Sequence, residues 1–271
     1  ALVAKGPLSH TTFWLGAAGN ASYGYFGGGQ DSNPGFSTVH RVDYSNDTAT
    51  AAAKGPLTAA IQYIAATGNT SYGYFGGGDY PAISTVNRID YSSDTGTTPT
   101  KGPLSVARYW LMATGDANFG YFAGGGPGPA PLSTVDRIDY SSDSPTAAVK
   151  GPLDTARRRG AATSSLTHGY FAGGSTPSAT TSVDRIDYSS DTPTAAAKGP
   201  LPNAVFGGAG VSSRMNGFTA SDRSNNQGII SYSDSDGNED ATTCQFDTDI
   251  DGKVKFSGAA GIVTSTSAVA A

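Results

Sequence analysis

The sequence has little of what several classes of protein require. Its single cysteine, Cys244, excludes an internal disulfide framework and a cysteine-based zinc site. Charged residues make up only 14% of the chain, the net charge is −5, and lysine and arginine cluster nowhere beyond Arg157-Arg158-Arg159, so no nucleic-acid-binding groove is expected. No run of about 18 apolar residues occurs, which predicts that the chain does not insert into a membrane.

Glycine, proline and aromatic residues are plentiful instead. The chain has 37 glycines, 15 prolines, 14 tyrosines and 11 phenylalanines. This many turn-forming residues disfavour long helices, and the aromatic residues are numerous enough to fill a core, so the low charge does not indicate disorder. The composition therefore predicts an all-β protein.

Two short sequence motifs recur along the chain. Lys-Gly-Pro-Leu begins five times, at intervals of 47 to 49 residues: Lys5, Lys54, Lys101, Lys150 and Lys198. Gly-Tyr-Phe, followed by Gly or Ala and two further glycines, begins four times: Gly24, Gly73, Gly120 and Gly169. A fixed period near 50 residues indicates a repeat architecture. We therefore predict four repeats over residues 1–201 and a divergent blade or β element with an extended tail over 202–271.

One repeat contains four strand-like runs. In the second repeat these cover residues 59–66, 71–76, 84–91 and a short stretch before Lys101. Short strands bounded by Gly, Pro, Asn and Asp form antiparallel meanders, and radially repeated four-stranded meanders form a β-propeller. Strands of the divergent fifth blade are expected at 204–208, 217–220 and 228–232.

The N-terminal residues stand where a fourth strand is expected. Ala1–Ala4 come directly before the first Lys-Gly-Pro-Leu, and no other strand of that unit precedes them. An unpaired strand edge promotes association, so propellers gain by pairing one terminus into the last blade. We predict that residues 1–4 complete the fifth blade; the alternative is an open array that pairs with another chain.

The repeat resembles the kelch/galactose-oxidase-like propeller repeat over roughly residues 1–210. The features that carry the resemblance are the aromatic strand ending in glycines, a later strand ending in Asp-Tyr (as in Asp90-Tyr91), and Pro-Leu-X-X-Ala-Arg before Arg108 and Arg157. The tryptophan that such repeats carry after the tyrosine strand is absent here. The resemblance implies four regular four-stranded blades plus a divergent fifth, and it carries no catalytic residue across.

The repeated motifs Gly-Tyr-Phe-Gly-Gly-Gly, Ser-Thr-Val-Asp-Arg-Ile-Asp-Tyr-Ser-Ser-Asp and Lys-Gly-Pro-Leu also resemble repeats in structural proteins of marine cyanobacterial phages. This resemblance implies a virion appendage, namely a tail fibre, a knob or a capsid decoration, on the virion or otherwise outside the cell. The partners it implies are other virion proteins or copies of the chain itself, together with a host-surface glycan. Two alternatives stay open: a secreted glycan-binding propeller, and a subunit of an extracellular filament joined by strand donation.

A possible metal site lies in the divergent region. The carboxylates Asp247, Asp249 and Asp251 are followed by Gly252, which is how a calcium-binding loop begins. Glycine occupies the twelfth position, Gly258, where an EF-hand loop has glutamate. Calcium is therefore the one cofactor suggested, and the alternative is a solvated acidic turn.

Other binding residues are expected in the loops that differ between repeats. These loops cover 30–36, 79–83, 126–132 and 175–181, and they contain two exposed-looking aromatic residues, Phe36 and Tyr80. Variable loops on a repeated scaffold are the usual place for binding. The three histidines fall at different positions of their repeats, and we expect no serine or carboxylate beside any of them. The sequence therefore favours a protein without enzymatic activity.

The charged strand Val-X-Arg-Ile-Asp-Tyr has two possible interpretations. Arg88 and Asp90 share one face of it, as do their equivalents in the other repeats. They could line a channel, or they could form ion pairs between blades; we favour the ion pairs because a charge in a closed setting must be paired. The aspartates of the turns that follow are expected only to cap those turns: Asp94, Asp143 and Asp191.

Overall fold

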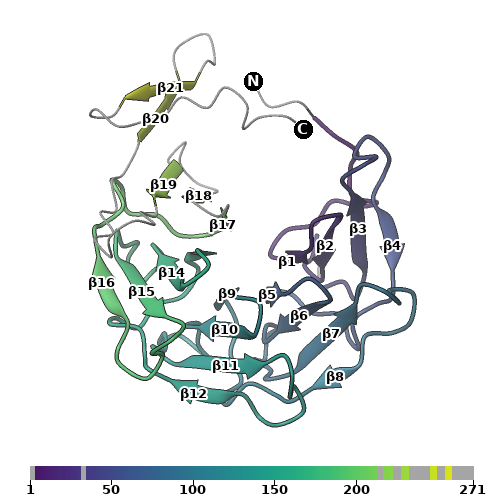
Figure 1. Ribbon diagram of the computed structural model, residues 1–271, viewed down its shortest axis with the longest axis horizontal. Helices are drawn as coiled ribbons and strands as arrows, with labels where there is room; N and C mark the ends of the chain where they lie inside the picture. Colours follow the sequence, from purple (N-terminus) through teal and green to yellow (C-terminus); the bar gives the residue numbers. More distant parts are fainter. Residues whose placement is uncertain are drawn as a thin grey trace.

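A computed structural model describes residues 4–31, 35–212, 216–221, 227–231, 245–248 and 254–257 of the chain. These residues form strands and connections and contain no helix, so none of them forms a helical membrane span, and the predicted all-β class is confirmed. Each of the four repeats forms one four-stranded antiparallel sheet, with its strands paired in chain order (Figure 1). We number these as the first to fourth repeat sheets.

The strand bounds repeat closely from sheet to sheet. The first repeat sheet consists of β1 (Gly16–Gly19), β2 (Tyr23–Gly27), β3 (Val39–Asp43) and β4 (Ala52–Lys54). The second consists of β5 (Ala65–Gly68), β6 (Tyr72–Gly76), β7 (Val86–Asp90) and β8 (Thr100–Lys101). The third consists of β9 (Met112–Gly115), β10 (Phe119–Ala123), β11 (Val135–Asp139) and β12 (Ala148–Lys150). The fourth consists of β13 (Ala161–Ser164), β14 (His168–Ala172), β15 (Val183–Asp187) and β16 (Ala196–Lys198).

Two smaller sheets follow in the divergent region. A three-stranded fifth sheet contains β17 (Gly208–Ser212), β18 (Asn216–Ser221) and β19 (Gln227–Ser231). A hairpin contains β20 (Gln245–Thr248) and β21 (Val254–Ser257). The strand predicted at 204–208 lies later in the chain, at β17, whereas those predicted at 217–220 and 228–232 overlap β18 and β19.

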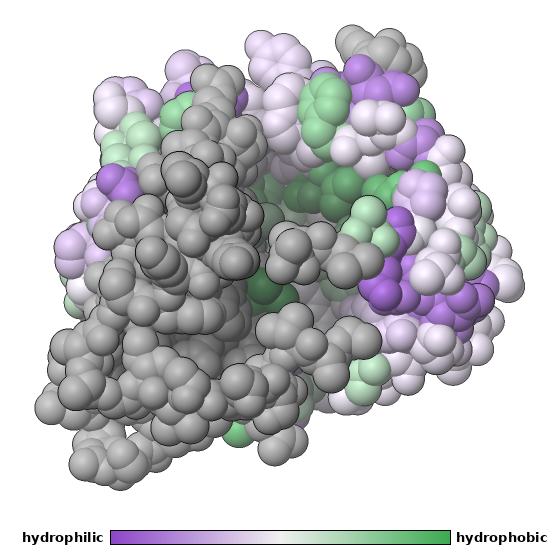
Figure 2. Space-filling model, turned by 90° about the horizontal axis from the view of Figure 1, so that it is seen from above, coloured by the Kyte–Doolittle hydropathy of each residue, from purple (hydrophilic) through white to green (hydrophobic). Residues whose placement is uncertain are grey.

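The sheets follow one another around an arc. The first strand of each sheet contacts the first strand of the next, in the order β1, β5, β9, β13 and β17. Figure 1 shows these strands innermost and the fourth strands outermost, with the arc open between the first repeat sheet and β17–β19. Seen from above, Figure 2 shows hydrophobic residues deep in the recess and more hydrophilic residues on the rim at the right. The arrangement is propeller-like.

The hydrophobic core lies between neighbouring sheets because aromatic residues alternate along each second strand. Tyr74 of β6 packs toward the third repeat sheet, where its ring stacks on Tyr140 at 4.8 Å. The next residue, Phe75, points to the other face and packs with Tyr25 of the first repeat sheet. Both rings of the Tyr-Phe pair are fully buried. The two-residue period of a strand thus supplies both faces of each sheet with a large ring.

Glycines allow the sheets to approach. A Cβ added to Gly76 would lie 2.8 Å from the ring of Phe122 in the next sheet. The two glycines that follow, Gly77 and Gly78, have φ angles of 66° and 100°, which only glycine adopts without strain. The glycines of the repeated Gly-Tyr-Phe motif therefore let neighbouring sheets pack closely and let the chain turn after the second strand.

One expectation about the strands is wrong. Residues 59–66 were predicted as a first strand, but the strand begins only at Ala65. The residues before it cross from the outermost strand of one sheet to the innermost strand of the next. Tyr63 in this crossing has a left-handed backbone, with φ of 58°, and such a residue cannot continue a strand.

Candidate functional site

The charged residues of the repeats hold neighbouring sheets together. The carboxylate of Asp94, in the second repeat, accepts a hydrogen bond from the Tyr25 hydroxyl at 2.9 Å and pairs with Arg41 at 2.7 Å and Lys54 at 3.1 Å, all from the first repeat. We call this arrangement the inter-sheet clasp. It recurs with Asp143 (Tyr74, Arg88 and Lys101) and with Asp191 (Tyr121, Arg137 and Lys150).

The clasp aspartates correct one prediction and refine another. They are nearly buried, with 7% of each side chain exposed, so their expected role as simple turn caps is wrong. The turn-capping role belongs to the strand aspartates: Asp90 accepts hydrogen bonds from the Ser92 backbone and hydroxyl at 2.9 and 2.6 Å. The predicted ion pairs between sheets are confirmed, with the turn aspartate instead of the strand aspartate as the acceptor.

A second set of buried charges lies within two of the repeats. Arg108 and Asp136 pair at 2.8 Å with neither side chain exposed, and Arg108 also donates to the carbonyls of Phe122 and Thr134. Arg157 and Asp184 pair at 3.0 Å in the fourth repeat. Each arginine is paired with its carboxylate and also donates to a backbone carbonyl, while the Nε of each has no hydrogen-bond partner among the described residues. Because the charges are paired and buried, we interpret them as structural groups.

The residues that cross between sheets form a different kind of surface. We call residues 8–15, 57–64, 104–111 and 153–160 the axial segments. Each contains one bulky residue in the left-handed backbone region, at the same place in its repeat and with φ between 57° and 61°: Trp14, Tyr63, Trp110 and Arg159. Such a backbone costs an L-residue about 1–2 kcal/mol. In the divergent region the same place is held by Gly207, with φ of 71°, which has no such strain. Four large side chains at a position where glycine is cheaper indicate that the side chains themselves have a role.

These four residues form one continuous line around the arc. Each backbone N–H donates to the carbonyl of its counterpart one repeat earlier: Tyr63 to Trp14 at 3.0 Å, Trp110 to Tyr63 at 3.1 Å, and Arg159 to Trp110 at 2.9 Å. Their side chains also meet. The ring centroids of Trp14 and Tyr63 are 4.4 Å apart, those of Tyr63 and Trp110 are 5.1 Å apart, and the Arg159 guanidinium lies 3.4 Å from the Trp110 ring centre. We call these four side chains the axial row.

Further aromatic and cationic groups flank the axial row. Phe13 packs on Trp14 at 4.5 Å and Tyr109 packs on Trp110 at 4.7 Å. Tyr80 lies 5.8 Å from Tyr109, and a second guanidinium, from Arg158, lies 4.8 Å from Trp110. The exposed fractions of Phe13 and Trp14 are 41% and 44%, so the first-repeat end of the row is open to solvent. Tyr80, beside Tyr109, is 73% exposed.

The variable loops lie directly beside the axial segments. Backbone bridges join Phe13 to Gln30, Tyr109 to Gly126 and Arg158 to Ser175, and each of these loop residues follows a Gly-Tyr-Phe motif. The loops and the axial row therefore belong to one end of the sheets, which makes this end the candidate binding surface.

The predicted binding residues fare differently. Tyr80 joins the cluster beside the axial row through Tyr109, whereas Phe36 is partly buried and packs on His10 at 4.1 Å. Trp14 and Trp110 were missed, although each stands nine residues after its Lys-Gly-Pro-Leu lysine, as do Tyr63 and Arg159. Aligning the repeats on that lysine is the signal that finds them.

The calcium prediction falls mostly outside the described residues. Asp249 and Asp251 lie there, and Asp247 lies in β20, where its backbone pairs with Lys255. Among the described residues no three His, Cys, Asp or Glu side chains gather closely enough to hold a metal ion.

The expectation that no serine or carboxylate lies beside a histidine is wrong. The Ser9 hydroxyl lies 2.7 Å from Nε2 of His40 and 3.2 Å from Nδ1 of His10.

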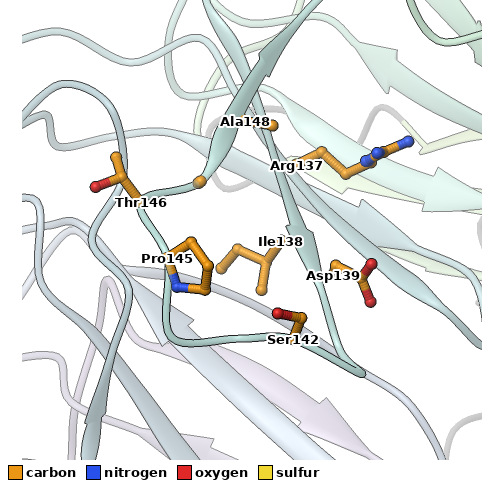
Figure 3. A pocket seen from close by; sticks show the side chains of 8 residues that line it. Arg137, Ile138, Asp139, Ser142, Pro145, Thr146 and Ala148 are labelled. Atoms are coloured by element: carbon orange, nitrogen blue, oxygen red, sulfur yellow. The ribbon is translucent and has the colours of Figure 1, made fainter.

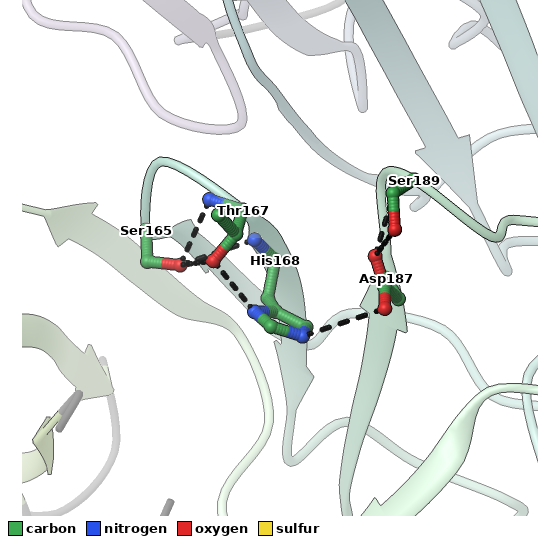
Figure 4. A network of polar contacts seen from close by, with 5 residues as sticks. All are labelled: Ser165, Thr167, His168, Asp187 and Ser189. Carbon is green, nitrogen blue, oxygen red and sulfur yellow. Dashed lines mark hydrogen bonds and ion pairs between the residues drawn. The ribbon is translucent and has the colours of Figure 1, made fainter. Parts of the chain in front are cut away.

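His168 has a carboxylate neighbour. The Nδ1 of His168 lies 2.8 Å from the Thr167 hydroxyl, and its Nε2 lies 3.9 Å from Asp187 (Figure 4). These are the residue types of a hydroxyl–imidazole–carboxylate relay, but 3.9 Å is too long for a hydrogen bond. Hydrogen bonds from Ser189 to Asp187 hold the pKa of that carboxyl below its ordinary value. The Asp187 carboxylate therefore caps the turn that contains Ser189 and does not form a relay with His168.

A shallow depression on the outer part of the third repeat sheet also carries no chemistry. Its lining side chains come from β11, β12 and the turn between them (Figure 3). Arg137 is committed to Asp191, Asp139 caps its own turn through Ser141, and the rest of the lining is mainly small and apolar.

Comparison with known proteins adds no identification. A scan of the sequence against protein-family models finds no match, and a search of curated proteins finds none either. Functional conclusions therefore depend on the geometry described above.

Proposed function

We propose that the chain is a non-enzymatic structural protein of a phage virion appendage, such as a tail fibre, a knob or a capsid decoration. In this role a rigid propeller of four kelch-like blades and a divergent fifth presents one end to the host surface. The observation that carries the proposal is the inter-sheet clasp: the repeated charged side chains bind sheet to sheet instead of converging on a reactive centre. The phage assignment itself comes from the resemblance of the repeated sequence motifs to repeats in phage structural proteins.

Location tests this proposal most directly. An antibody raised against the chain should label purified phage particles at an appendage in immunogold electron microscopy, and mass spectrometry should find the chain in the same particles. An antibody against an unrelated host protein is the control. Absence of the chain from particles, with the protein free in the medium, would favour the secreted glycan-binding propeller, the second candidate, which the exposed aromatic residues of the axial row support.

Closure of the propeller belongs to the same proposal. Lys5 pairs with Asp47 at 3.1 Å and the Gly6 N–H donates to the Asp47 carbonyl at 2.7 Å, as Lys54 and Gly55 do with Asp94. Residues 5 and 6 thus take the place of the end of a fourth strand, and the fifth sheet has three strands. We propose that residues 1–4 pair with β19 and complete a fifth blade.

Exposure of the first repeat sheet supports this proposed closure. Tyr44 has an exposed fraction of 54%, whereas its equivalents in the other three repeat sheets, Tyr91, Tyr140 and Tyr188, have 7% or 8%. Deleting Ala1–Ala4 should therefore lower the melting temperature while the mass measured by light scattering stays that of the native protein. A multimer that dissociates on this deletion would instead identify strand donation between copies, as in a filament.

A further inference from the structure

We infer that the axial row and its flanking residues form a binding site for an acidic glycan, a sugar chain that carries carboxylate or sulfate groups. The inference deepens the host-contact role proposed above and rests on it only for the source of the glycan. The first step concerns the apolar part of the site. Flat aromatic rings bind sugars by packing against the C–H faces of the pyranose ring, which requires rings that are held rigidly and are open to solvent.

Trp14, Phe13 and Tyr80 are open to solvent, and Trp14 is also held rigidly. The first two are about two-fifths exposed and Tyr80 about three-quarters. Trp14 is fixed by its left-handed backbone, by its stacking on Tyr63 and by the hydrogen bond from the Tyr63 N–H to its carbonyl. A ring that is immobilised before binding loses little conformational entropy when the ligand arrives.

The second step concerns charge. Along the axial segments the side chains change from aromatic to cationic: the pair Phe13-Trp14 in the first repeat corresponds to Arg158-Arg159 in the fourth. Both guanidinium groups lie over Trp110, at 4.8 and 3.4 Å, so they are held at the far end of the same row. Arg158 also donates to the Gly128 carbonyl at 2.8 Å, which fixes its guanidinium. Two fixed, neighbouring cations attract a carboxylate or a sulfate, and a guanidinium carries five N–H donors, so it can serve a ligand as well as a protein partner. A neutral sugar chain would not need them.

Backbone strain gives the third step. Glycine at Gly207 shows that the left-handed position is filled without strain in the fifth repeat, so the four large side chains are not required to form the turn. Trp14→Gly should therefore keep the turn and remove only the ring. Few sites offer a variant in which the loss of a contact residue leaves the backbone conformation favoured.

The two tryptophans of the chain, Trp14 and Trp110, both belong to the axial row, so tryptophan fluorescence, excited selectively over the 14 tyrosines, reports on this site alone. The full chain is titrated with alginate oligosaccharides, which are chains of uronic acids, and with neutral dextran oligosaccharides of matched length. We expect a saturable change in emission with the oligouronate, little change with dextran, and a weakening of binding as NaCl rises.

Variants make the test specific. Trp14→Gly should weaken oligouronate binding by about tenfold or more while the melting temperature is maintained, and Arg158→Gln with Arg159→Gln should remove the preference for the acidic chain at a similar cost in affinity. Leu166→Ala, which removes an exposed apolar side chain from the turn between β13 and β14, should bind like the native protein.

Three results would overturn the inference. They are no saturable response to the oligouronate, equal affinity for dextran and oligouronate, and native affinity in the Trp14→Gly variant. The proposed function fails by a different observation, because absence from phage particles would leave the titration unchanged and a silent titration would leave the scaffold role unchanged.

Discussion

The buried pair of Arg108 and Asp136 offers a test in which the chain supplies its own control. At the equivalent places the second repeat has Ile61 and Asn87, and there the Thr58 hydroxyl donates to the Asn87 side-chain oxygen at 2.7 Å. The two positions change together, charged with charged and uncharged with uncharged. We therefore predict that Arg108→Ile and Asp136→Asn are each severe alone and mild in combination.

The magnitude follows from the burial of both groups. Neither side chain has any exposed surface, and burial lowers the pKa of Arg108 while the charge of Asp136 opposes that shift. Removing one member of a fully buried ion pair leaves an uncompensated charge and costs about 3–5 kcal/mol. In the Arg108→Ile variant the orphan is Asp136, which keeps only the hydrogen bonds from the Ser105 backbone and hydroxyl.

The double variant should lose much less. An apolar residue opposite an amide already packs in the second repeat, where Ile61 is 1% exposed. Replacing a buried ion pair by residues of similar volume is often close to neutral, so we expect a loss of about 1–2 kcal/mol for the double variant. The coupling free energy between the two positions should then reach several kcal/mol.

Urea unfolding of the native protein, both single variants and the double variant measures this cycle, with coincident fluorescence and circular dichroism transitions as the check for cooperative unfolding. Val106→Ala, at an exposed position of the same axial segment, is the control and should change stability by less than about 0.5 kcal/mol. Additive losses in the double variant would refute the reasoning, because they would show that the two positions are independent.

Three further predictions test other parts of the molecule. Burial raises the pKa of the Asp143 carboxyl, but hydrogen bonds from Tyr74 and Lys101 and the charge of Arg88 outweigh burial and hold that pKa below its ordinary 3.8. The contribution of Asp143 to folding stability is therefore complete above that pH and is lost as the pH falls. Asp143→Asn should be less stable than the native protein near pH 7 and should lose less stability on acidification, as measured by melting temperature from about pH 5 to about pH 2. Arg137→Ala should cost about 1–2 kcal/mol in urea unfolding, since its side chain is 24% exposed and Asp191 keeps its lysine partner; an unchanged midpoint would show that the guanidinium contributes nothing to the clasp. If the predicted carboxylates of the divergent region bind calcium, EDTA should lower the melting temperature and added calcium should restore it; a melting temperature indifferent to both would contradict the site.

Much of the scaffold was predictable from the sequence because its signals repeat. The constant spacing of Lys-Gly-Pro-Leu, and the glycines and Asx turns that bound each run, indicate four-stranded meanders, and three of the four strands in a repeat lie close to where they were expected. The first strand was misplaced because Ile61 and Ile64 lie among apolar residues that also suit a strand. The left-handed backbone at Tyr63 rules out a strand at that residue, and the amino-acid composition gives no indication of it.

The contacts between repeats were harder to predict. Asp90 and Asp94 are four residues apart, and each has a serine within two residues of it, so local sequence gives both the same turn-capping chemistry. Only the packing of sheets shows that Asp94 meets an arginine 53 residues earlier in the chain. The axial row needed the same information, since its members are neighbours in space and about one repeat apart in sequence.

The direction of the inter-sheet clasp has a consequence for how such a chain can change over evolutionary time. Each clasp joins an aspartate to donors in the repeat immediately before it, and the three described clasps use the same residue types. A duplicated repeat would bring its own aspartate for the preceding unit and its own tyrosine, arginine and lysine for the following one. Gene segments of this length can therefore be gained or lost in frame without leaving an unmatched interface, so that arc length is free to vary among descendants while the joints stay constant.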